Sequence, residues 1–289
     1  MILQQLISGM ALGSIYAIIA LGFVLIYKAT EVVNFAQGAM MMVAAYFSST
    51  LMLSLNLPYL LAFGLTLVFS AVLGIILDRI VFRPLIGYPL FPIVVATLAV
   101  AIIIEGVCGM IWGPATITLP SPFPKEPYTW GNAFIAPVNF WVIIFGAGLM
   151  LFFLVFFRYT TLGTAMRATA EDIRAAYLCG ISAKRVFTIT WAISAVVGAI
   201  AGMLTVPVIF LWPGLGHIGL KAFPAAVLGG FGSIPGAIVG GLVLGVSEVM
   251  ASGYLPEGIK DVFAWILMLI ILLLRPEGIF GSYEKQRKV

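Results

Sequence analysis

The chain has 289 residues and a formal net charge of +4; 62% of its residues are hydrophobic and only 9% are charged. Soluble domains carry roughly 25% charged residues, so this composition, with a mean hydropathy of +1.16, excludes a water-soluble globule and predicts an integral membrane protein. One span needs about 20 apolar residues, so about seven or eight spans leave only short loops and no soluble catalytic domain. We therefore expect one all-α domain over 1–289, a polytopic membrane helix bundle.

Apolar segments follow one another along the whole chain. They lie at about 6–26, 36–55, 59–77, 93–112, 139–157, 187–210, 222–250 and 259–274. The first has no Lys or Arg before Lys28, unlike the basic start of a cleaved signal peptide, so we expect it to remain in the mature protein.

A few polar side chains fall at or inside these segments. Asn34 and Gln37 mark the edge of the second, and because unpaired amides are costly in hydrocarbon they should face other helices or the pathway. Glu105 lies inside the fourth, where an ionisable group points to function by default. It serves either ion coupling or, without a cationic partner in the spans, a hydrogen bond between helices. Ser247 and Glu248 either touch solute or lie at headgroup level.

The loop 113–138 is rich in proline and carries Tyr128 and Trp130, residues typical of membrane interfaces. Its prolines are Pro114, Pro120, Pro122, Pro124, Pro127 and Pro137. We interpret it as an external lid or docking surface, or alternatively as a stiff connector.

The most informative polar stretch is 158–186, between the fifth and sixth segments. Thr169 followed three residues later by Asp172 is a capping-box pattern, and Gly180 is a natural helix stop, which predicts a short helix over 170–179. Its apolar face comprises Ile173, Ala176 and Tyr177. This helix would either dock into a socket on another protein or lie on the membrane surface.

The segment 222–250 is too short for two full spans and is interrupted in its middle. The interruption contains Gly229, Gly230, Gly232, Pro235 and Gly236. This pattern predicts a broken or re-entrant hairpin. Non-helical backbone inside a membrane persists only where protein or a water-filled cavity satisfies its hydrogen bonds, so we expect this segment in a packed core or beside a pathway.

Orientation follows from the positive charges, which accumulate on the cytoplasmic side. With the N-terminus outside and the C-terminus cytoplasmic, the inner side receives Lys28, Arg79, Arg83, Arg158, Arg167, Arg174, Lys184, Arg185, Arg275, Lys285, Arg287 and Lys288. The outer side receives only Lys125, Lys221 and Lys260. This division requires an even number of crossings in 222–250. Asp78, Arg79 and Arg83 are interpreted as anchors at the lipid headgroups.

The sequence does not assemble side chains for metal or nucleotide chemistry. Cys108 in an apolar segment and Cys179 in the 158–186 loop are interpreted as free thiols. The single histidine, His217, has no carboxylate or thiol neighbour in sequence, so no metal site is expected. No phosphate-binding loop and no nucleic-acid fold are recognisable. We expect no cofactor, and energy from a partner or an ion gradient.

Several motifs resemble one family of membrane proteins. RAAYLCG (174–180) resembles the Glu-Ala-Ala signature of bacterial ABC importer permeases, with Arg174 in place of the glutamate. KAFPAAVLGGFGSIPG (221–236), NFAQG (34–38), RATAED (167–172) and RPEGIFG (275–281) resemble the smaller permease subunit of branched-chain amino acid importers. Many members carry His and Glu where Gln37 and Ala39 stand here, and urea and short-amide permeases have similar motifs, so those solutes remain an alternative.

The resemblance implies a multi-pass inner-membrane subunit, not itself an enzyme, that translocates branched-chain or other hydrophobic amino acids. Its implied partners are a second permease subunit, two ABC ATP-binding subunits and a periplasmic solute-binding protein. Contact with the ATP-binding subunits is assigned to Arg167, Glu171, Asp172, Arg174, Ala175, Ala176 and Gly180. The candidate pathway residues are Asn34, Gln37, Glu105, Gly229, Gly230, Gly232 and Ser233. The alternative function is a self-sufficient secondary transporter or channel, coupled to ions through Glu105.

Overall fold

The computed structural model describes residues 2–85, 87–120, 122–124, 126–130, 133–254 and 256–281. Its helices are α1 (Ile2–Thr30), α2 (Gln37–Ser49), α3 (Tyr59–Leu77), α4 (Leu90–Trp112), α5 (Pro137–Tyr159), α6 (Thr161–Glu171), α7 (Ile173–Leu178), α8 (Ala183–Thr205), α9 (Leu215–Lys221), α10 (Phe223–Gly229), α11 (Ile234–Ser252) and α12 (Glu257–Leu274). Four residues of the charge count lie outside the described residues: Lys125, Lys285, Arg287 and Lys288.

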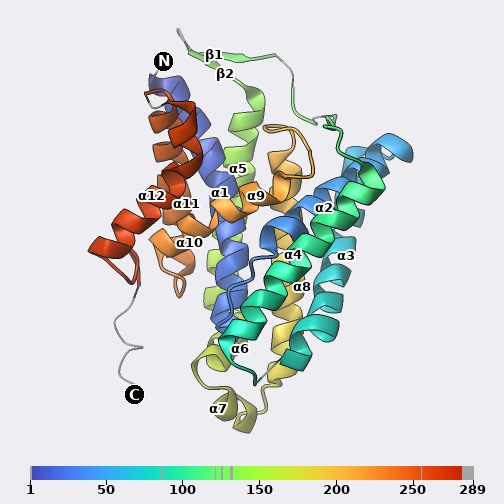
Figure 1. Ribbon diagram of the computed structural model, residues 1–289, viewed down its shortest axis with the longest axis vertical. Helices are drawn as coiled ribbons and strands as arrows, with labels where there is room; N and C mark the ends of the chain where they lie inside the picture. Colours follow the sequence, from blue (N-terminus) through green and yellow to red (C-terminus); the bar gives the residue numbers. More distant parts are fainter. Residues whose placement is uncertain are drawn as a thin grey trace. The chain divides into compact units, whose positions relative to one another are not determined.

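Six of the described helices are long and apolar enough to cross a membrane: α1, α3, α4, α5, α8 and α11. Shorter apolar helices cover Leu215–Gly229 and Val262–Leu274. This arrangement confirms the predicted all-α, polytopic bundle (Figure 1).

Two apolar segments form shorter α-helices than their hydropathy predicts. The segment 36–55 contains α2 and then a π-helical turn, Thr50–Ser54. The apolar segment 187–210 extends beyond α8, which ends at Thr205. Pro207 follows two residues later and has no amide hydrogen with which to continue the helix.

The loop 113–138 contains two short strands that the sequence analysis did not predict. β1 (Tyr128–Trp130) pairs antiparallel with β2 (Ala133–Ile135), and Thr129 lies opposite Phe134. Ile117 forms an isolated bridge with Leu211, so part of this loop is held by backbone hydrogen bonds.

The chain forms two compact units, each built from separated parts of the sequence. The first comprises Met1–Val24, Phe123–Leu154 and Lys221–Val289, and the second comprises Leu25–Pro122 and Val155–Leu220.

In the first unit, α1 and α11 run antiparallel with their backbones in contact. A Cβ added to Gly9 would lie 2.9 Å from the Cα of Val246, and one added to Gly13 would lie 2.9 Å from the Cα of Leu242. Glycines permit this approach because they carry no side chain, as small-residue rows do in other membrane helices.

The predicted break in 222–250 is present in the first unit, with arms of unequal length. α10 has 7 residues and α11 has 19. Between them Gly230 adopts a φ of +92°, and the Ser233 hydroxyl accepts a hydrogen bond of 3.1 Å from the Gly236 amide to begin α11. α10 packs against α11 with Gly229 and Gly236 in backbone contact.

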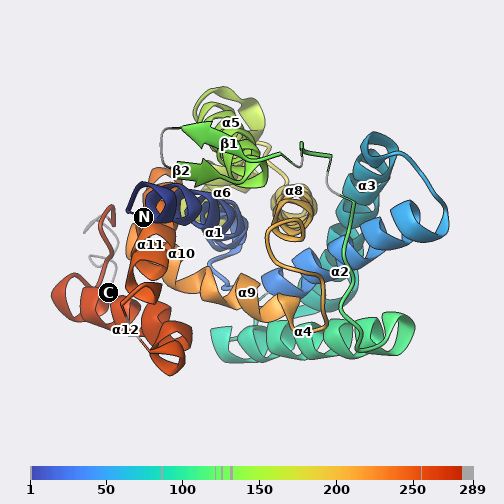
Figure 2. The ribbon, with the colours of Figure 1, turned by 90° about the horizontal axis from the view of Figure 1, so that it is seen from above.

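In the second unit, α2 packs against α3, α4 and α8, and Figure 2 shows it between α8 and α4. Gly202 of α8 lies against the backbone of Met41. Trp191 of α8 is buried and stacks on Phe82 with ring centroids 4.1 Å apart. This core holds the ends of α3 and α8 together.

Candidate functional site

The loop 158–186 folds into two helices, which corrects the prediction of one helix over 170–179 capped by Thr169. Thr169 lies inside α6, and its hydroxyl donates to the Ala165 carbonyl at 2.8 Å. Asp172 is the cap of α7: its carboxylate accepts hydrogen bonds from the amides of Arg174, at 2.7 Å, and Ala175, at 3.1 Å. The predicted stop is present, since Gly180 follows α7 with a φ of +81°.

α7 exposes apolar side chains at its tip. Its one buried residue is Ala176, whereas Ile173 is 50% exposed, Tyr177 74% and Leu178 86%. Contiguous exposed apolar residues rimmed by charges are typical of protein or membrane contacts. The exposed surface of α7 therefore fits both alternatives, docking into a partner protein and lying on the membrane surface.

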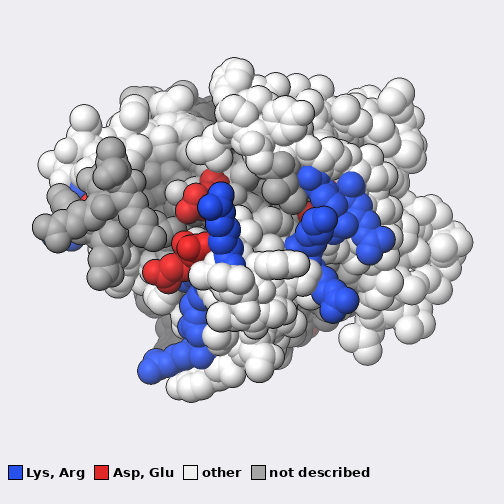
Figure 3. All heavy atoms as spheres, turned by 90° about the horizontal axis from the view of Figure 1, so that it is seen from below, with Lys and Arg blue, Asp and Glu red and all other residues white. Residues whose placement is uncertain are grey.

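Charged side chains surround α7 on what we call the basic face of the second unit. Figure 3 looks onto this end, where Lys and Arg side chains gather beside Asp and Glu side chains. The Lys and Arg residues of the second unit that are exposed are Arg79, Arg158, Arg167, Arg174, Lys184 and Arg185, and Lys28 and Arg83 are half-buried. The residues assigned to a partner contact are exposed except for Ala176: they are Arg167, Glu171, Asp172, Arg174, Ala175 and Gly180.

A hollow of about 450 Å³ lies beside α7 in the second unit. Its lining consists of Ala29, Thr30, Glu31, Thr169, Ala170, Glu171, Asp172, Ile173 and Arg174. Three of these carry carboxylates, so the hollow offers negative charge next to the exposed apolar tip.

Asn34 and Gln37 are brought together with α8, inside the second unit. Both are fully buried. The Gln37 amide donates to the Ser194 carbonyl at 3.1 Å, the Ser194 hydroxyl donates to Gln37 Oε1 at 2.9 Å, and Asn34 donates to the same oxygen at 3.4 Å. Gln37 thus faces another helix, as expected, and fastens the start of α2 to α8, whereas the hydrogen bonds of Asn34 lead to Ala36, Gln37 and Met40 beside it.

Glu105 has a partner that the sequence analysis missed. Its Oε1 lies 3.7 Å from Nε2 of His217 on α9, and the side chains are 42% and 68% exposed, respectively. The two residues are far apart in sequence, so only the fold reveals the pair.

The other candidate pathway residues lie in the first unit, at the break before α11. Gly229 and Gly230 are buried, Gly232 is exposed and Ser233 is half-buried. The same unit contains an ion pair of 3.9 Å between Lys221 and Glu248. Tyr16, which is buried, hydrogen-bonds to Glu248. Glu248 therefore lies among protein groups in the first unit, with its side chain 13% exposed.

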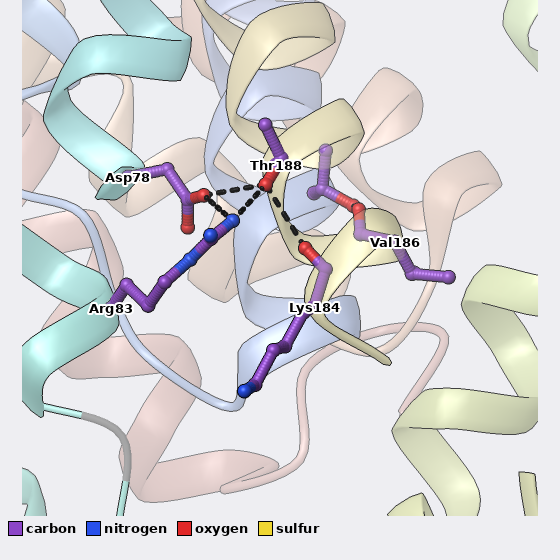
Figure 4. A network of polar contacts seen from close by, with 6 residues as sticks. Asp78, Arg83, Lys184, Val186 and Thr188 are labelled. Atoms are coloured by element: carbon purple, nitrogen blue, oxygen red, sulfur yellow. Dashed lines mark hydrogen bonds and ion pairs between the residues drawn. The ribbon is translucent and has the colours of Figure 1, made fainter. Parts of the chain in front are cut away.

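A further polar cluster, also missed by the sequence analysis, joins α3 to α8. Asp78 was interpreted as a lipid-facing anchor, but it is 1% exposed and pairs with Arg83 at 3.1 Å. Thr188 of α8 donates to the same carboxylate (Figure 4). Among the described residues, no group of three His, Cys, Asp or Glu side chains could hold a metal ion, and Cys108 and Cys179 are free thiols.

Six spanning helices, a broken helical hairpin and an exposed, capped helix on a charged face define a multi-pass membrane protein of the transporter type. Residues 5–272 match the model of the family described as branched-chain amino acid transport system, permease component. The chain belongs to this permease family and is a multi-pass inner-membrane protein.

Individual relatives match over almost their whole length. The high-affinity branched-chain amino acid transport system permease protein LivH of Escherichia coli (strain K12) is 34% identical, over 99% of this chain and 97% of that protein. The corresponding protein BraD of Pseudomonas aeruginosa is 32% identical with the same coverage. Among solved structures, PsaBC from Streptococcus pneumoniae in complex with Fab matches with a TM-score of 0.49 and 15% identity, over 96% of this chain and 92% of that chain.

Proposed function

We propose that this chain is one half of the transmembrane pore of an ABC importer for branched-chain or other hydrophobic amino acids. Membership of the permease family and the names of relatives such as LivH support this function. The complex would contain a second permease subunit, two ATP-binding subunits and a periplasmic solute-binding protein. The N-terminus lies outside and the basic face is cytoplasmic, because positive charge accumulates on that side.

The observation that carries the proposal is the capped helix α7 with its exposed apolar tip. Tyr177 and Leu178 enter a socket on an ATP-binding subunit, while Arg167, Glu171 and Arg174 pair with charges around that socket. Asp172 acts indirectly, since its carboxylate holds the first turn of α7. ATP binding draws the two ATP-binding subunits together and displaces α7, and the bundle then switches between outward and inward openings.

Solute recognition in the pathway rests on backbone groups more than on charged side chains. Gly230 and Gly232 interrupt the helices before α11, and the positive end of a helix that begins after such a break is suited to the carboxylate of an amino acid. Gln37 serves the pathway indirectly, by fixing α2 against α8, and Asn34 supports Gln37 through a hydrogen bond to its Oε1.

The second candidate function, an ion-coupled transporter, is favoured by one observation, the approach of His217 to Glu105. A carboxylate next to a histidine could accept and release a proton as transport proceeds. In that case uptake would collapse with an ionophore and survive depletion of ATP. The ABC function requires the reverse.

The test is uptake of radiolabelled leucine into proteoliposomes that contain this chain and the proteins that co-purify with it. Uptake should require enclosed ATP and the binding protein, and Leu178→Asp should abolish it by placing a charge in the apolar contact. Glu105→Gln is the control and should transport normally. Uptake of urea in place of leucine would refute the amino-acid assignment, and ATP-independent uptake that fails in Glu105→Gln would establish the ion-coupled alternative.

A further inference from the structure

Asp78, Arg83 and Thr188 form a compact polar cluster between the end of α3 and the beginning of α8. Asp78 begins a π-helical turn, Asp78–Phe82, directly after α3. The Arg83 amide closes this turn on the Asp78 carbonyl. A π-helical turn is wider than an α-helical turn and brings residues i and i+5 together, which places the two side chains side by side. Such turns are often found at functional sites.

The cluster satisfies a carboxylate that is almost completely buried. The side chain of Asp78 is 2% exposed, and its Oδ2 accepts from the Thr188 hydroxyl at 2.6 Å and from Arg83 Nη2 at 3.1 Å. Arg83 Nη2 also donates to the Thr188 hydroxyl oxygen at 2.5 Å. Removing one partner from a buried charge is strongly unfavourable, so the three side chains move together. Figure 4 shows them converging from the two helices.

The cluster lies close to α7 along the chain. Only residues 179–182 separate α7 from α8, and Thr188 lies near the beginning of α8. α6 and α7 both pack against α8. A displacement of α7 is therefore delivered first to the part of α8 that carries Thr188.

The packing beyond the cluster extends this connection into α3. Phe82 stacks on Trp191, and a Cβ added to Gly74 would lie 2.5 Å from the Trp191 carbonyl oxygen. α3 and α8 thus pack closely at Gly74 and Trp191. The cluster adds a charged link between them at the beginning of α8, which is the end next to α7.

We propose that Asp78, Arg83 and Thr188 transmit the displacement of α7 through α8 to α3, as positioning residues that couple ATP hydrolysis to the opening of the pore. This inference rests on the proposed ABC function. It predicts that weakening the link uncouples the two processes, because α8 then moves without carrying α3 with it.

The test compares Thr188→Val with Thr190→Val in the full complex in proteoliposomes. Thr190 lies on the same helix, but its hydroxyl donates only to the Val186 carbonyl of its own helix, at 2.8 Å. We expect the complex with Thr188→Val to hydrolyse about tenfold more ATP per leucine imported than the wild-type complex. A tenfold change is typical of losing a hydrogen bond to a charged group. Thr190→Val and Thr188→Ser should keep the wild-type ratio.

The ratio of ATP hydrolysed to leucine imported distinguishes a cluster that transmits the displacement of α7 from one that only stabilises the fold. A purely structural cluster would lower the melting temperature or the yield of Thr188→Val and leave the ratio unchanged, which would overturn the inference. If Thr188→Val does not assemble, Arg83→Lys replaces it, because it keeps a positive charge beside Asp78 and loses the planar geometry of arginine. A wild-type ratio in that variant also overturns the inference. Failure of the wild-type complex to couple ATP to uptake would instead refute the proposed function.

Discussion

A charged residue on α7 can act through the helix cap or through its charge, and two substitutions of Asp172 distinguish these roles. The Asp172 carboxylate caps α7 through the amides of Arg174 and Ala175, and it adds negative charge beside the exposed tip. Asp172→Asn keeps a side-chain oxygen for the cap and removes the charge, whereas Asp172→Ala removes both. We expect Asp172→Asn to transport almost normally and Asp172→Ala to be impaired.

The size of the effect follows from the cap. Replacing an N-cap residue by Ala costs about 1 kcal/mol, which corresponds to about a fivefold shift between folded and frayed α7. α7 has only 6 residues, and isolated helices shorter than about 12 residues are marginal, so the helix has little other local stability. Hydrogen exchange at the Arg174 and Ala175 amides should therefore accelerate about fivefold or more in Asp172→Ala.

The assays are hydrogen exchange on the chain in nanodiscs and leucine uptake by the complex. Glu171→Gln is the control for charge alone, because the Glu171 side chain is exposed and does not cap α7. Equal impairment of Asp172→Asn and Asp172→Ala, with unchanged amide exchange in both, would refute the role of the cap and return Asp172 to direct contact with the partner.

Two further predictions concern the first unit. Gly229→Ala would drive a methyl group into the backbone of Gly236 and should cost about 1–3 kcal/mol of stability, measured as a lower melting temperature. Gly232→Ala is the control and should be tolerated, because no atom lies within 4 Å of the added Cβ. Equal stability of the two variants would contradict the close contact between Gly229 and Gly236. Glu248→Leu should cost about 3 kcal/mol because it removes the ion pair with Lys221 and the hydrogen bond with Tyr16. Adding Lys221→Met should recover part of this loss, and simple addition of the two losses would show that the pair does not interact.

The sequence predicted the features that depend on local patterns. Hydropathy identified the helical bundle, and the glycines and proline near Gly230 identified the break before α11, because these residues interrupt helices wherever they fall. The predicted start of α7 was wrong for a local reason. Thr169 fits a capping pattern, but its hydroxyl instead donates to the Ala165 carbonyl within α6, and only the fold decides between these two arrangements.

Pairings between distant segments could not be predicted from patterns. Gln37 and Ser194, or Glu105 and His217, meet only after α2, α4, α8 and α9 have packed. Asp78 and Arg83 are close in sequence, but their spacing of five does not match the three or four residues of an α-helical face, so the pair depends on a π-helical turn. The sequence therefore indicated which polar residues matter but did not indicate which residues they contact.

The contact between α1 and α11 has a consequence for biogenesis. Gly9 and Gly13 meet Val246 and Leu242, so α1 leaves the ribosome long before the helix that packs against it. Until α11 is synthesised, α1 resides in the bilayer with its glycine face covered by lipid or by another protein. Contacts between such distant segments form slowly, because a long intervening chain must first be ordered. The insertion machinery therefore has a long interval in which to bind this face.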